Sequence, residues 1–111
     1  GHTCGSIALL DRENKILLSG DSVQEGPIYM FGEFRSLEAQ IESLKKLNDM
    51  KGAFDVILPC HNTLPVYPDI IDVLIEGANE LRQGNLKGKP VDLGWAKTNQ
   101  YNYKNISYYY D

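Results

Sequence analysis

The stretch SIALLDRENKILLSGD, residues 6–21, decides the fold class, because it joins two apolar runs through four polar residues. Two such runs predict a β-hairpin, with Asn14 able to adopt a left-handed conformation in the turn. Both strands are expected to be half or fully buried. The second run ends at Ser19-Gly20-Asp21, so it leaves a carboxylate where a strand gives way to a loop. Rigid scaffolds tend to carry their chemistry at such places.

Two helices and one further strand are predicted after the hairpin. Ser36 is a candidate N-cap, and a 3.6-residue period predicts a helix of about three turns that buries Leu37, Ile41, Leu44 and Leu47. The apolar run Phe54–Leu58 predicts a strand that Pro59 ends, because proline cannot donate to a sheet ladder. A second helix is expected from about residue 68 to 82. It would have Pro68 in its first turn, Gly84 after its end, and a buried face of Ile71, Leu74, Ile75, Ala78 and Leu81.

The remaining segments are predicted as loops, apart from a final strand. Residues 22–34 contain chain breakers, and residues 84–90 are expected to be a connector. Residues 106–110 form the predicted last strand of a tyrosine-rich tail, since aromatic residues fit a pleated surface. Four residues of the first loop, Tyr29, Met30, Phe31 and Phe34, could line an apolar substrate site or could simply cover the sheet and the first helix.

Composition limits the class of protein. The chain has 111 residues, which suits one domain, and its 42% hydrophobic and 23% charged fractions are those of a soluble globular protein. No apolar stretch approaches the ~20 residues that cross a bilayer. The net charge of −4 argues against nucleic-acid binding, which needs a basic surface. With no secretory signal in view and no CxxC pair, Cys4 and Cys60 are interpreted as reduced thiols of a cytoplasmic protein, although one disulfide between them stays open.

Three metal-capable side chains, His2, Asp21 and His61, lie next to predicted strand ends. Imidazole and carboxylate suit Zn²⁺, Mn²⁺ or Fe, and catalytic sites draw such ligands from separate loops. Each residue also has a simpler interpretation: a terminal or tag histidine, a turn or cap aspartate, or a structural histidine. A closed structural zinc site made of His2, Cys4, Cys60 and His61 is a further alternative.

Three motifs, taken together in this order, resemble elements of the metallo-β-lactamase superfamily. GHTCGSI at residues 1–7 resembles its "GHTPGS" element, LSGD at 18–21 resembles its "FxGD" strand end, and PCH at 59–61 resembles its "P-x-H" loop. The resemblance implies an α/β fold. Residues 1–111 would be a single partial domain, the carboxyl-terminal half of an αββα sandwich, with a mixed β-sheet that carries helices on one face.

The resemblance also implies roles for these residues. His2 would bind the first metal, Asp21 would bridge both metals, and His61 would bind the second, with Thr3, Gly5 and Ser6 holding His2 in place. Family members are two-metal hydrolases, so Asp21 and His61 would serve catalysis on a small acyl, lactone, thioester or phosphoester substrate. Zinc is the expected metal, with manganese or iron as alternatives.

Two departures from the family pattern shape the expectation. Cys4 replaces the usual proline, and the "HxHxDH" segment that supplies the other ligands is missing. Three ligands divided between two metals should bind metal weakly. In the full sandwich the inner face of this sheet would pack on the other half, so a lone half would expose an apolar patch. We therefore expect this chain to form a homodimer or to associate with the missing half. The alternative is a non-catalytic fragment or remnant that self-associates.

Overall fold

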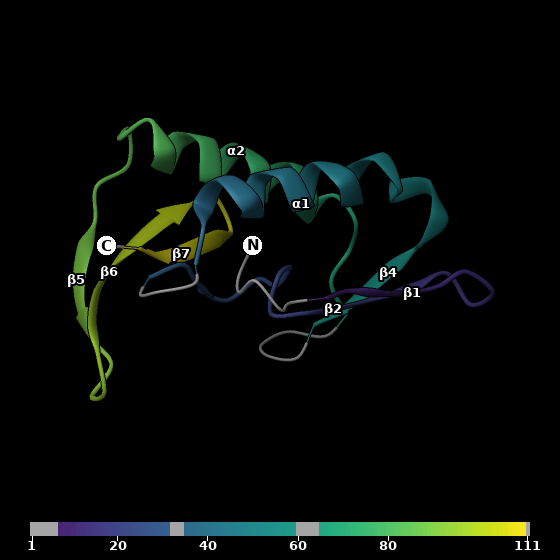
Figure 1. Cartoon of the computed structure of the whole chain (residues 1–111), viewed down its shortest axis with the longest axis horizontal. Helices are drawn as coiled ribbons and strands as arrows, with labels where there is room; N and C mark the ends of the chain where they lie inside the picture. The colour runs from purple at the N-terminus through teal and green to yellow at the C-terminus, as the bar shows by residue number, and fades with distance from the viewer. Residues whose placement is uncertain (1–6, 32–34, 60–64, 111) are drawn as a thin grey trace.

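The structure is a computed structural model that describes residues 7–31, 35–59 and 65–110. Two long helices lie side by side and cover one side of the strands (Figure 1). Along the chain, the described elements are β1 (Leu9–Asp11), β2 (Ile16–Gly20), β3 (Ile28–Tyr29), α1 (Leu37–Asp49), η1 (Lys51–Ala53), β4 (Val56–Pro59), α2 (Ile70–Arg82), β5 (Lys89–Asp92), β6 (Lys97–Tyr103) and β7 (Ile106–Tyr110).

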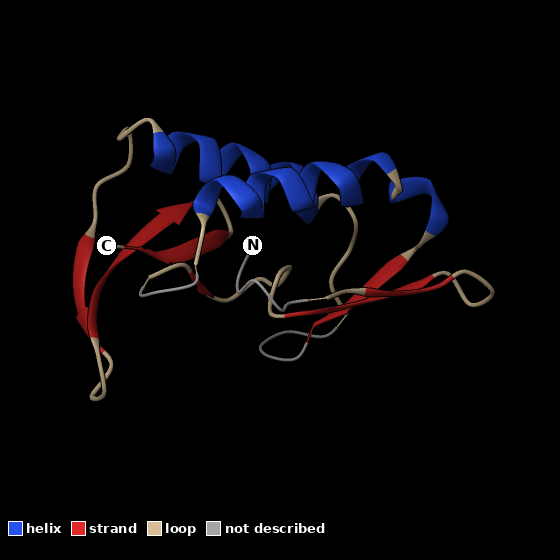
Figure 2. Ribbon diagram, viewed as in Figure 1, coloured by secondary structure: helices blue, strands red, loops and turns tan. Residues whose placement is uncertain are grey.

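The strands form two sheets, and Figure 2 shows both sheets on the same side of the helices. The first has the order β1-β2-β4, with β1 antiparallel and β4 parallel to β2. The second has the order β3-β7-β6-β5, in which only the β3–β7 pair is parallel. The predicted α/β class is confirmed. The strands are divided between two mixed sheets, however, because the segment after β2 leaves the first sheet before β3 pairs with β7.

The predicted hairpin is present, but its left-handed turn residue is not the expected one. Lys15, with φ of 56°, adopts the left-handed conformation in place of Asn14. Asn14 instead donates from its backbone N–H and its side chain to the Asp11 carboxylate, at 3.0 and 2.9 Å. These bonds lower the pKa of Asp11. Of the two expected degrees of burial the hairpin shows the lesser, because the helices cover one face only: Leu17 is 1% exposed, whereas Leu9 is 58% and Leu18 is 43% exposed.

Both helices form where the periodicity predicts them. The Ser36 hydroxyl accepts a hydrogen bond from the Ala39 N–H at 3.2 Å, which confirms Ser36 as the N-cap of α1. Helix α2 begins at Ile70, two residues after Pro68, and ends before Gly84, whose φ of 76° suits glycine at that place. Among the described residues, neither helix is long and apolar enough to span a membrane.

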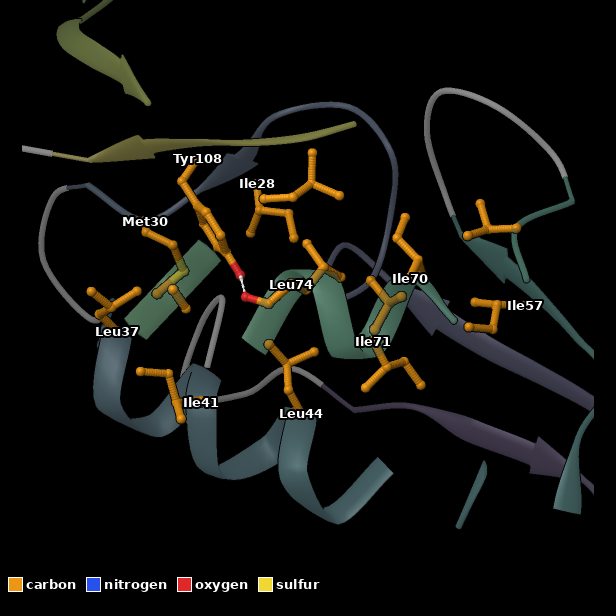
Figure 3. Close-up of a cluster of buried hydrophobic side chains, with 14 of the residues drawn as sticks. Ile28, Met30, Leu37, Ile41, Leu44, Ile57, Ile70, Ile71, Leu74 and Tyr108 are labelled. Atoms are coloured by element: carbon orange, nitrogen blue, oxygen red, sulfur yellow. Dashed lines mark hydrogen bonds between the residues drawn. The ribbon is translucent and has the colours of Figure 1, made fainter. Parts of the chain in front are cut away.

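The core lies between the helices and the covered faces of the two sheets. Figure 3 shows Leu44 of α1, Ile71 and Leu74 of α2, and Tyr108 of β7 in one cluster, where each is fully buried. The Tyr108 hydroxyl donates to the Leu74 carbonyl at 3.0 Å, and burial raises the pKa of this hydroxyl. Gly77 lets α2 approach the sheet, since a Cβ there would lie 2.8 Å from Ile106 Cδ1.

Three strands were not expected from the sequence. Strand β3 lies inside the predicted 22–34 loop, and β5 and β6 occupy a region predicted as connector and weakly alternating tail. Pro90 is tolerated in β5 because β5 is an edge strand of its sheet. Strand β7 confirms the predicted final strand at residues 106–110.

Candidate functional site

Asp21 directly follows β2, at the carboxyl end of that strand, and is half-buried. Gly20 has a φ of 60°, which turns the chain away from the sheet at this point. Gly20 pairs with Pro59, the last residue of the parallel strand β4. The chain therefore leaves two neighbouring parallel strands at the same sheet edge, after Gly20 and after Pro59. Ligand sites in α/β sheets favour this kind of edge.

Buried hydrogen bonds hold the turn that contains Asp21. The Ser22 N–H donates to the Ser19 carbonyl at 3.2 Å, and the Ser19 hydroxyl donates to the Val23 carbonyl at 2.8 Å. Gln40 of α1 donates from Nε2 to the Ser22 carbonyl, also at 2.8 Å. Ser19 and Gln40 are both fully buried, so these bonds are shielded from water. The backbone on each side of Asp21 is therefore fixed to the strand and to helix α1.

Strand β4 is bridged to a residue that precedes α2. Ile57 and Val66 form an antiparallel bridge and exchange two hydrogen bonds, of 2.7 and 2.9 Å. Both residues are buried, at 0% and 1% exposure. The sequence between them contains Pro59-Cys60-His61, of which only Pro59 is described.

The other predicted site residues lie outside the described residues. These are His2, Thr3, Cys4, Gly5, Ser6, Phe34, Cys60 and His61. Of the three predicted metal ligands, only Asp21 is described. Within residues 7–31, 35–59 and 65–110, no group of three or more His, Cys, Asp or Glu side chains is arranged to hold a metal ion. The predicted ligand set stays a prediction, and so does the alternative zinc site of two cysteines and two histidines.

Four rings form a cluster on the side of the second sheet that faces away from the helices. This aromatic cluster consists of Tyr29, Phe31, Trp95 and Tyr109. Tyr29 and Tyr109 are paired on β3 and β7, next to the buried pair of Ile28 and Tyr108. Successive strand side chains point to opposite faces, so the cluster lies opposite the core.

The described residues of the predicted aromatic loop lie in two different environments, and the substrate-site interpretation stays a prediction. Met30 is 3% exposed and belongs to the core, as the covering interpretation requires. Tyr29 and Phe31 are half-buried and instead join the aromatic cluster.

Sequence reasoning missed two contributors to these sites. Gln40 lies three residues after Leu37, on the apolar face of α1. A polar residue on that face predicts a buried hydrogen bond, because buried polar groups are almost always paired. Trp95 offered no periodic signal, because it lies in the turn between β5 and β6 and joins the cluster only through the pairing of β6 with β7.

Comparison with known proteins gives one partial match. No family model matches the chain. The chain is 36% identical over 63 residues to the acyl-coenzyme A thioesterase MBLAC2 of Gallus gallus. The aligned segment covers 55% of this chain, and the chain spans 23% of the length of that relative. Over the aligned segment, the match gives weak support to a metallo-β-lactamase-like relationship.

Proposed function

We propose that this chain is part of a metal-dependent hydrolase of the metallo-β-lactamase type, which acts on a small acyl substrate, with thioesters first among the candidates. The main support is Asp21. Its turn is fixed by buried hydrogen bonds at a sheet edge where two parallel strands end, and β4 leads into Pro59-Cys60-His61. The partial similarity to an acyl-coenzyme A thioesterase favours a thioester over a lactone or a phosphoester.

In this proposal, His2, Asp21 and His61 would hold zinc, because carboxylate and neutral imidazole are ligands of that ion. When bound, the metal pair would supply Lewis acidity and lower the pKa of bound water. The chain's own contribution is the rigid turn around Asp21, because a displaced ligand holds metal poorly and positions a substrate badly.

The proposal includes a partner for the exposed side of the first sheet. Ile7, Leu9 and Leu18 are 73%, 58% and 43% exposed, and Leu9 and Leu18 are paired across the strands. The backbone of Ile7 lies beside Gly20, so the apolar surface continues along β2. Exposed apolar patches of this kind mark interaction sites. We propose that a second copy of the chain covers this surface when the chain is alone, and that the rest of a longer hydrolase covers it otherwise.

A zinc titration followed by calorimetry tests the metal assignment. We expect weak binding by the chain, because three ligands are divided between two ions. We expect Asp21→Asn to weaken that binding by about tenfold or more, as loss of a ligating group does. Asp55→Asn is the matched control, since Asp55 precedes β4 at the opposite end of that strand and is exposed. Equal zinc affinity in Asp21→Asn and the parent chain would remove Asp21 from the site.

Hydrolysis distinguishes the enzyme from a non-catalytic remnant. In a longer natural protein that contains this chain, an "HxHxDH" segment before Gly1 would complete the ligand set. We expect that protein, loaded with zinc, to hydrolyse an acyl thioester, and we expect Asp21→Asn to abolish turnover. If the segment is absent and no thioester, lactone or phosphoester is hydrolysed, the non-catalytic alternative holds.

A further inference from the structure

Three rings of the aromatic cluster lie in nearly parallel planes. The planes of Tyr29 and Trp95 differ by 20°, with ring centroids 6.2 Å apart, and those of Phe31 and Trp95 differ by 30° at 5.7 Å. Tyr29 and Phe31 are also 5.7 Å apart, at 31°. Tyr109 packs beside Tyr29 at 5.1 Å and a 60° tilt. The cluster therefore presents similarly oriented aromatic faces.

Trp95 is held in place although it is exposed. Its side chain is 69% exposed, unlike a tryptophan that stabilises a core. The Leu93 N–H donates to the Ala96 carbonyl at 2.9 Å, and the Gly94 N–H donates to the Asp92 carboxylate at 2.8 Å. Gly94 has a φ of 88°, which only glycine adopts easily. This closed turn restrains the backbone at Trp95, and the ring contacts with Tyr29 and Phe31 orient the indole before any ligand arrives, which lowers the entropy cost of binding.

A cation adjoins the cluster. Arg35 donates from Nη1 to the Tyr29 carbonyl at 2.9 Å and is half-buried. A guanidinium has five N–H donors, and this bond uses one of them. Arginine binds phosphate through paired hydrogen bonds. Aromatic faces beside an arginine are the combination that recognises a flat ring attached to a phosphate, as in single-stranded nucleic-acid sites.

We propose that the aromatic cluster and Arg35 bind the adenine nucleotide part of the thioester substrate. This inference rests on the proposed function, because a coenzyme A thioester carries an adenine ring and phosphates at the end remote from the acyl group. The adenine stacks on the faces of Trp95 and its neighbours, and Arg35 receives a phosphate. An acyl chain is the less suitable occupant, because it offers no charge to Arg35 and gains most from a closed apolar pocket.

Fluorescence gives a direct test, since Trp95 is the only tryptophan of the chain. We expect adenosine 3′,5′-bisphosphate to change Trp95 emission in a saturable way. Phe31→Leu should weaken this binding by about tenfold, the usual effect of removing one stacking ring. Arg35→Gln should weaken it and reduce its dependence on salt. Tyr67→Leu is the control, because Tyr67 is 61% exposed and lies outside the cluster.

The outcomes separate this inference from the proposed function. Nucleotide binding needs neither metal nor turnover. An absence of hydrolysis would therefore contradict the proposed function without contradicting the nucleotide site. If the neutral probe decanol saturates the Trp95 signal and the nucleotide does not, or if neither ligand binds, the nucleotide site is wrong whatever the zinc titration shows. Should Phe31→Leu fail to fold by circular dichroism, Trp95→Ala replaces it, with binding measured by calorimetry. Unchanged nucleotide affinity in that variant would also overturn the site.

Discussion

At the scale of single residues, neighbouring tyrosines of β7 have opposite environments. Tyr108 is fully buried and donates to the Leu74 carbonyl, whereas Tyr109 joins the aromatic cluster. Burial raises the pKa of Tyr108, because the phenolate would lose its hydration. A group whose folded-state pKa is raised contributes stability that is complete below its unfolded pKa. For tyrosine that value is about 10, so the contribution is lost as the pH rises above it.

Tyr108→Phe tests this linkage. At neutral pH we expect the free energy of unfolding to fall by about 1 kcal/mol, because one buried hydrogen bond is removed. Between about pH 9 and about pH 11, however, the variant should lose less stability than the parent chain, since it has no hydroxyl to ionise at that position. Urea unfolding at several pH values measures both effects. Tyr67→Phe, at an exposed ring, should behave like the parent. Equal alkaline losses in Tyr108→Phe and the parent would contradict the explanation.

At the scale of elements, the local sequence determines where the helices form. Strands such as β3 and β5 depend instead on pairing with segments elsewhere in the chain. Helix α1 begins at its predicted cap and buries three of the four leucine and isoleucine residues predicted for its inner face, with Leu47 half-buried. Strand β3 has two residues and exists only because it pairs with β7, about eighty residues later in the chain. Strand β5 contains a proline and is tolerated only at an edge. Such strands have no sequence pattern of their own.

Ser36→Ala tests the cap of α1. We expect a loss of about 1 kcal/mol in the free energy of unfolding, because the Ala39 N–H loses its acceptor. Ser43→Ala is the matched control: it makes the same change in the exposed middle of the same helix, where alanine is slightly favourable. Chemical denaturation of both variants gives the comparison. Equal stabilities would mean that the cap contributes nothing.

At the scale of the whole molecule, both helices cover the same side of the two sheets (Figure 2). The opposite side therefore carries the exposed leucines of the hairpin and the aromatic cluster together. Exposed apolar side chains grouped in this way are the basis of the proposed self-association. The turn of Asp21 lies at the edge of this arrangement, where it is held from the strand side by Ser19 and from the helix side by Gln40.

Self-association through the hairpin surface is the prediction at this scale. We expect light scattering at micromolar concentration to give the mass of a dimer for the parent chain. The double variant Leu9→Lys with Leu18→Glu should give a monomer, because it places charges in the interface while keeping opposite charges paired across the strands. Met50→Lys changes an exposed apolar residue just after α1 and should stay dimeric. A monomeric mass for the parent chain would contradict the proposed dimer.

The candidate site was predictable in part. Asp21 could be selected because a carboxylate directly follows an apolar strand, and the structure puts it at a parallel strand end, held by its neighbours. The side chains that hold it could not be selected in the same way. Gln40 on the apolar face of α1 indicated a buried hydrogen bond, but its acceptor, the Ser22 carbonyl, is a residue distant in sequence that only the folded chain brings into contact.

The sequence by itself determined the α/β class, the hairpin and both helices, because periodicity, caps and turn residues act within a few residues of each other. Only the tertiary structure decided that the strands divide into two sheets, that Leu9 and Leu18 are exposed, and that Trp95 meets Tyr29. These outcomes depend on which faces the helices cover and which distant strands pair. Burial and strand pairing are properties of the assembled chain, so no local stretch of it could specify them.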